Sequence, residues 1–90
     1  MKSLMTSHGC LVQINGGGWR TFNTSTKAAS HVAKNLINGR RAQVCFDRTN
    51  DAKNVQFAFT KEVESVMKHF GDSRSISAVD GLSTTTFYSV

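Results

Sequence analysis

One segment of the sequence limits the possible folds more than any other, because residues 24–38 predict an amphipathic helix that has to cover a sheet. Its apolar side chains recur at a spacing that gathers them on one side of a helix, and they are Ala28, Ala29, Val32, Ala33, Leu36 and Ile37. Thr24, Ser25 and Thr26 are candidate N-caps, and Gly39 follows where helices commonly end. Because alanine is small, this helix is expected to approach its sheet closely.

The rest of the chain predicts strands and one further helix. Strand-forming residues and alternating apolar positions predict six strands, at residues 10–15, 19–23, 41–48, 55–59, 75–79 and 82–90. A second helix is predicted from Thr60, its N-cap, to Phe70. Its apolar residues recur at helical spacing, and they are Val63, Val66, Met67 and Phe70. The predicted order is therefore ββαββαββ.

Glycine marks the expected turns. Residues 15–18 read Asn-Gly-Gly-Gly, and both residue types tolerate positive φ, so they predict a hairpin between the first two strands. Asp80 and Gly81 predict a second hairpin with a two-residue turn. Residues 49–54 are expected to form a polar loop. The hydroxyl-rich segment 83–88 is expected at an edge of the sheet.

Ninety residues provide one hydrophobic core, so we expect a single domain over residues 1–90, with residues 1–8 as a flexible N-terminal segment. The predicted fold class is α+β, a two-layer sandwich whose mostly antiparallel sheet carries both helices on one face. Periodicity assigns four aromatic residues to the core: Phe46, Phe57, Phe59 and Phe70. The opposite face of the sheet is expected to carry Arg20, Gln43, Cys45, Gln56 and several Ser and Thr residues.

The charges are distributed unevenly along the chain. Residues 1–46 contain six Lys and Arg and no Asp or Glu, so they carry +6. Residues 47–90 contain five basic and six acidic residues, so they carry −1 and the whole chain carries +5. Such an asymmetry predicts an electropositive surface that attracts an anionic partner.

Helical spacing gathers part of this positive charge into a stripe. Lys27, His31 and Lys34 recur at i, i+4 and i+7 on the first predicted helix. We expect them to form a partner-binding face with the basic residues around them and with Trp19, a residue type common at binding hot spots. The complete candidate set is Trp19, Arg20, Lys27, His31, Lys34, Arg40 and Arg41.

No motif in the sequence indicates catalysis. The glycines at 16–18 precede a strand and lack the Lys and Ser or Thr of a phosphate-binding loop. The three histidines and two cysteines match no zinc-binding spacing. Cys10 and Cys45 are expected to be free structural thiols, with no histidine placed to activate either one. We therefore expect no enzyme, no metal site and no cofactor.

The sequence also predicts the cellular location of the protein. Its apolar stretches are far shorter than the roughly 20 residues that a membrane-spanning helix needs. Residues 1–8 lack the apolar region of a secretory signal. We therefore expect a cytoplasmic protein with no membrane association.

In its short length, polarised charge and lack of a catalytic motif, the chain resembles the small inhibitors that phages and mobile elements encode against host defence, anti-CRISPR proteins among them. The resemblance implies a non-enzymatic inhibitor or regulator and assigns no site residues. Together with the basic face, it predicts docking on an acidic or nucleic-acid-handling surface of a larger complex. The alternative is a module that binds DNA or RNA directly.

Overall fold

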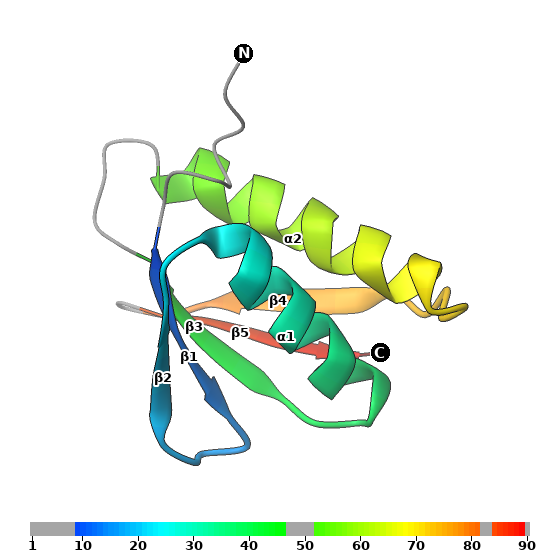
Figure 1. Cartoon of the computed structure of the whole chain (residues 1–90), viewed down its shortest axis with the longest axis horizontal. Coiled ribbons are helices and arrows are strands. Elements are labelled where there is room, and N and C mark those ends of the chain that lie inside the picture. Colours follow the sequence, from blue (N-terminus) through cyan, green and yellow to red (C-terminus); the bar gives the residue numbers. More distant parts are fainter. Residues whose placement is uncertain (1–8, 47–51, 82–83, 90) are drawn as a thin grey trace.

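The computed structural model describes residues 9–46, 52–81 and 84–89, which form five strands and two helices (Figure 1). In chain order these are β1 (Cys10–Ile14), β2 (Trp19–Phe22), α1 (Ser25–Ile37), β3 (Ala42–Phe46), α2 (Ala52–His69), β4 (Ile76–Asp80) and β5 (Thr85–Ser89). The α+β class is thereby confirmed. The predicted order ββαββαββ is wrong by one strand, since the observed order is ββαβαββ.

All five strands form one antiparallel sheet in the order β2-β1-β3-β5-β4. The first hairpin forms as the sequence predicts, because Asn15 and Gly16 both adopt positive φ (48° and 75°) and the Gly17 N–H donates to the Ile14 carbonyl. The third strand, β3, lies in the middle of the sheet, between β1 and β5.

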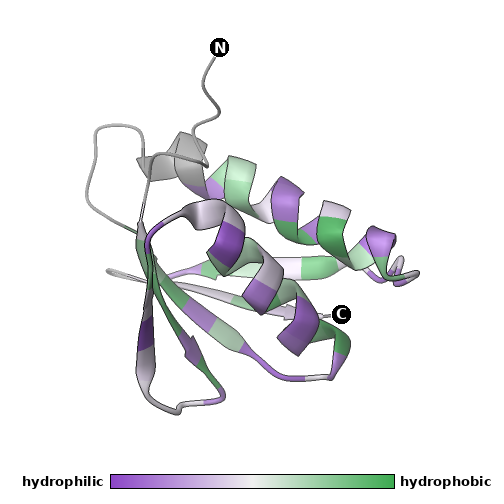
Figure 2. Ribbon diagram, viewed as in Figure 1, coloured by the Kyte–Doolittle hydropathy of each residue, from purple (hydrophilic) through white to green (hydrophobic). Residues whose placement is uncertain are grey.

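Both helices contribute to the hydrophobic core on one side of the sheet (Figures 1 and 2). The predicted stripe of α1 is confirmed, since Ala28, Ala29, Val32, Ala33 and Leu36 are buried and Ile37 packs beside them. Thr24 caps the helix by accepting from the Lys27 N–H, and Gly39 follows it at φ 78°. From α2, the Phe59 ring packs against Phe46 and Phe87 of the sheet, 5.1 and 5.3 Å between ring centroids.

The predicted strand at residues 55–59 is wrong, because these residues lie within α2. Phe59, Val63 and Met67 are spaced four residues apart and all are buried, so helical rather than alternating periodicity governs the segment. Thr60 is not an N-cap. It lies inside the helix, where its hydroxyl donates to the Gln56 carbonyl.

Two aromatic residues predicted for the core lie on the surface. Phe57 is 66% exposed and Phe70 is 56% exposed. In a strand Phe57 would share a face with Phe59, but in the observed helix side chains two residues apart point in different directions. Phe70 follows the last residue of α2, next to Gly71 at φ 81°.

The second hairpin also differs from its prediction. Asp80 pairs with Thr85 and is the last residue of β4, so it does not belong to a two-residue turn with Gly81. The strand expected at the edge, β5, is internal between β3 and β4, and its inward residues Thr85 and Phe87 are buried. The predicted N-terminal segment 1–8 and residues 49–51 of the predicted polar loop lie outside the described residues.

Candidate functional site

The predicted partner-binding residues do not form one surface. Strand register decides where they lie: Arg20 pairs with the buried Val12, whereas Trp19 pairs with Gln13. Arg20 is therefore on the side of the sheet that carries the helices, and its predicted place on the opposite face is wrong. The predicted place of Gln56 on that face is also wrong, since Gln56 belongs to α2 and donates to Asp80.

On the helix side, Arg20 of β2 lies close enough to His31 of α1 for its charge to act on the imidazole. We call these two residues and the lysines of the α1 stripe, Lys27 and Lys34, the basic cluster. Phe22 of β2 is the apolar base of this cluster. The Arg20 guanidinium lies over the Phe22 ring at 5.0 Å, and the His31 ring packs on the same residue with 5.3 Å between centroids. Residues that are distant in sequence thus meet around one ring.

The charges of the cluster act on His31. Partial burial, and then the positive charges of Arg20 and Lys34, hold the pKa of His31 below its usual 6.5. The imidazole is therefore neutral at neutral pH, and the permanent charges of the cluster belong to its Arg and Lys residues.

Arg40 lies just beyond the C-terminal end of α1. Its guanidinium donates to the Asn35 side chain at 3.3 Å, and its backbone N–H donates to the Asn35 carbonyl at 3.0 Å. Asn35 follows Lys34 in the helix and itself donates to the His31 carbonyl. Arg40 therefore extends the positive charge of the α1 stripe, as the sequence predicts.

No carboxylate neutralises the basic cluster within the described residues. The ion pair found there joins Arg74 and Asp72, at 2.6 Å, beyond the C-terminal end of α2. It lowers the pKa of Asp72 through hydrogen bonds from Arg74. Helix α1 itself contains no acidic residue, and no ion pair among the described residues involves its lysines.

Neither of the two helices of the described residues covers the other side of the sheet (Figure 1). We call this surface the open sheet face, and its strand residues are Leu11, Gln13, Trp19, Thr21, Gln43, Cys45, Ser77, Val79, Thr86 and Tyr88. None of these residues is charged. The two charged residues that the strands contain, Arg20 and Asp80, both lie on the helix side.

Arg41 borders the open sheet face at the start of β3. Its guanidinium lies over the Tyr88 ring at 5.1 Å. Asn15 fixes the Arg41 backbone in both directions, because its side-chain oxygen accepts from the Arg41 N–H and its N–H donates to the Arg41 carbonyl. Beside them lies an open cavity of about 370 Å³, which is lined by Gln13, Asn15, Gly16, Arg41, Gln43 and Thr86.

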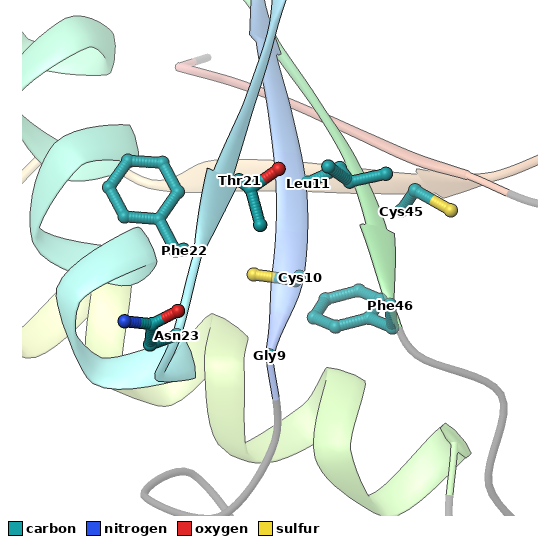
Figure 3. A pocket seen from close by; sticks show the side chains of 8 residues that line it. All are labelled: Gly9, Cys10, Leu11, Thr21, Phe22, Asn23, Cys45 and Phe46. Carbon is teal, nitrogen blue, oxygen red and sulfur yellow. The ribbon is translucent and has the colours of Figure 1, made fainter.

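A second cavity, of about 470 Å³, lies at the N-terminal end of β1, away from Asn15 (Figure 3). Cys10 and Cys45 both line it. Leu11 pairs with Cys45, so the two cysteines point to opposite sides of the sheet, as their diverging sulfurs in Figure 3 show. Both thiols are free, as predicted. This geometry prevents a disulfide without a change of register.

The chemistry of Cys10 is that of a structural thiol. Burial, and then the neighbouring Cys45, raise its pKa to about 11, so the thiol stays protonated at neutral pH. A nucleophilic cysteine needs a lowered pKa instead.

Within the described ranges, no group of three His, Cys, Asp or Glu side chains is placed to hold a metal ion. No helix there combines the length and hydropathy that spanning a membrane requires.

Two residues that matter to these surfaces were not in the predicted set. Phe22 organises the basic cluster, and Tyr88 supports Arg41. Both are aromatic residues in predicted strands, but only the register shows which cation each one meets.

Comparisons with known protein families, with curated proteins and with solved structures give no match. The function of the chain therefore has to be inferred from the chemistry of its own surfaces. Two surfaces are available: the basic cluster on the helix side and the open sheet face behind it.

Proposed function

We propose that the protein is a non-enzymatic binding protein, of the inhibitor or regulator type, that docks its basic cluster on an acidic protein surface of a larger complex. One observation supports this most strongly: Arg20 converges with His31 and Lys34, and no carboxylate among the described residues neutralises them. Uncompensated charge of one sign steers association with a surface of the opposite sign.

The shape of the cluster favours an extended partner over a small anion. Lys27 and Lys34 lie seven residues apart on α1, which corresponds to about 10 Å along the helix axis. Arg20 adds a cation from the neighbouring strand. Such a spread of charges suits an acidic patch, whereas a small anion would need them to converge within hydrogen-bond distance of one point.

The experiment that tests this proposal uses paired charge reversals. Lys27→Glu with Lys34→Glu reverses the cluster, and Lys61→Glu with Lys68→Glu makes the same change of net charge on α2. Tagged proteins are used to capture partners from lysate of the native cell, with and without nuclease, and the partners are identified by mass spectrometry. We expect the first variant to lose its protein partner and the second to keep it.

The two variants share one change at the end of a helix. Each places one Glu in the last turn of a helix, at position 34 or 68. The Glu at position 27 also completes a capping box with Thr24, which stabilises α1. Equal capture by both variants would contradict the proposal, as would a partner that disappears when nuclease is added.

A further inference from the structure

The open sheet face carries a continuous row of side chains across all five strands. Strand pairing places Trp19 beside Gln13, Gln13 beside Gln43, Gln43 beside Thr86 and Thr86 beside Val79. The middle of the row consists of two amides and a hydroxyl, each of which donates and accepts hydrogen bonds. Within the described residues the Gln43 side chain has no hydrogen-bond partner, so its amide is available to a ligand.

Aromatic rings lie at two places on this face. Trp19, on the edge strand, is 45% exposed. Tyr88, on β5, is half-buried and carries the Arg41 guanidinium. Strands β2 and β5 are three strand spacings apart, about 14 Å. Planar groups can stack on an aromatic ring and on a guanidinium, so the face offers separated stacking positions with hydrogen-bonding groups between them.

Arg41 supplies the positive charge that this face otherwise lacks. Asn15 holds its backbone, and Tyr88 supports its guanidinium beside the cavity of about 370 Å³. No acceptor among the described side chains engages the guanidinium. A fixed guanidinium with unused donors suits a phosphate oxygen.

These features together point to one class of ligand. We propose that the open sheet face binds a single strand of nucleic acid, with one unpaired base on Trp19, another on the Arg41 guanidinium that Tyr88 supports, and a phosphate oxygen at the N–H edge of that guanidinium. The strands β1, β2 and β3 come from the half of the chain without acidic residues, and Asp80, the single carboxylate of the strands, faces the helices. Charge therefore favours a polyanion over a second copy of this chain, which also carries +5.

This inference does not rest on the proposed docking of the basic cluster, since it involves different residues on the other side of the sheet. It is tested by titrating labelled single-stranded DNA and RNA of about 10 nucleotides into the protein. Label anisotropy reports affinity. Trp19 is the single tryptophan of the chain, so quenching of its fluorescence reports binding at this face.

The expected results distinguish the face from general electrostatics. Tyr88→Leu should weaken binding about tenfold, because it removes the ring that supports the Arg41 guanidinium and the base stacked on it, whereas Tyr88→Phe keeps the ring and the affinity. Arg41→Gln and Lys27→Gln leave the same net charge, and only the first should weaken binding by more than about threefold. Trp19→Ala, at an exposed edge position, gives a second variant that leaves the core intact.

Several results would overturn the inference. Equal losses for Arg41→Gln and Lys27→Gln would mean that any cation suffices. Binding without a change in Trp19 fluorescence would place the ligand elsewhere. A dimer in sedimentation that Trp19→Ala dissociates, with no oligonucleotide bound at low salt, would assign the face to a second copy of the chain.

Discussion

Phe22 shows how one apolar side chain organises charged neighbours. It lies on an edge strand, half-buried, with a guanidinium over its ring and an imidazole packed beside it. A cation over an aromatic ring keeps most of its hydration while it gains attraction to the ring face. The ring therefore holds Arg20 close to His31 in a place where the two positive groups would otherwise repel each other when the histidine is protonated.

The His31 environment predicts a pH dependence of stability. In the unfolded chain His31 has its usual pKa of 6.5, and in the folded protein its pKa is lower. The unfolded state therefore binds the proton more readily, and stability falls as the pH decreases from 6.5 through the folded pKa. Urea unfolding at about pH 7 and about pH 5 measures this loss.

The control for this prediction is His31→Gln. The variant loses the ring contact with Phe22 at both pH values, but it should show a smaller difference between them. Asp72 does not confuse the comparison, because its pKa is lowered from 3.8 and its contribution is lost only in stronger acid. An unchanged difference in the variant would show that other groups cause the pH dependence.

The two cysteines should differ in reactivity towards a thiol reagent. Cys10 is buried and has a pKa of about 11, so at about pH 8 only on the order of one molecule in a thousand carries its thiolate. Cys45 is half-buried on the open sheet face. Reaction with Ellman's reagent should therefore be biphasic, and Cys45→Ser should remove the fast phase. A single fast phase for both thiols would contradict the prediction.

Among the secondary-structure elements, the sequence pattern predicts the first half of α2 wrongly. Val55, Phe57 and Phe59 alternate as in a strand, and the same sequence also contains the helical series Phe59, Val63 and Met67. A short apolar run fits both periods. The longer helical series decides the structure because it buries its residues against α1 and the sheet.

A pair of alanine substitutions tests in solution whether Phe57 and Phe59 follow the helical or the alternating strand pattern. Phe59→Ala removes a fully buried ring and should destabilise the protein by about 3–5 kcal/mol. Phe57→Ala should change the stability by less than about 0.5 kcal/mol, because its side chain is exposed. Urea unfolding measures both. Similar losses for the two variants would instead fit the alternating strand.

Outside α2 and the second hairpin, local patterns predict the local structure correctly. The α1 stripe, its Thr24 cap and the Asn15-Gly16 turn all depend on neighbouring residues, and all three form as expected. Helical spacing likewise placed Lys27 on one stripe with Lys34. Strand register and strand order depend on distant residues, so the sequence could not place Arg20 on the helix side or β5 inside the sheet.

The whole molecule is a sheet with different chemistry on its two sides. Helices and the basic cluster occupy one side, and an uncharged face bordered by Arg41 forms the other. The two surfaces lie on opposite sides of the sheet and share no residue.

This separation predicts that the two binding activities are independent. Lys27→Gln with Lys34→Gln should lose the protein partner and keep Trp19 quenching by oligonucleotide at physiological salt. Tyr88→Leu with Arg41→Gln should show the reverse pattern. Capture assays and fluorescence titrations of the same preparations measure both activities. Loss of both activities in either variant would indicate a single shared surface.

The position of β3 has a consequence for how the chain folds. The two hairpins join neighbouring segments, but β3 pairs with β5 across more than 40 residues, from Val44 to Thr85 at the closest pair. Pairings of such long range form slowly because the intervening chain must first be ordered. Until β5 pairs with it, one edge of β3 stays unpaired and Val44 lacks the neighbour that Thr85 provides. A slowly completed sheet therefore leaves this edge free to pair with other chains during synthesis.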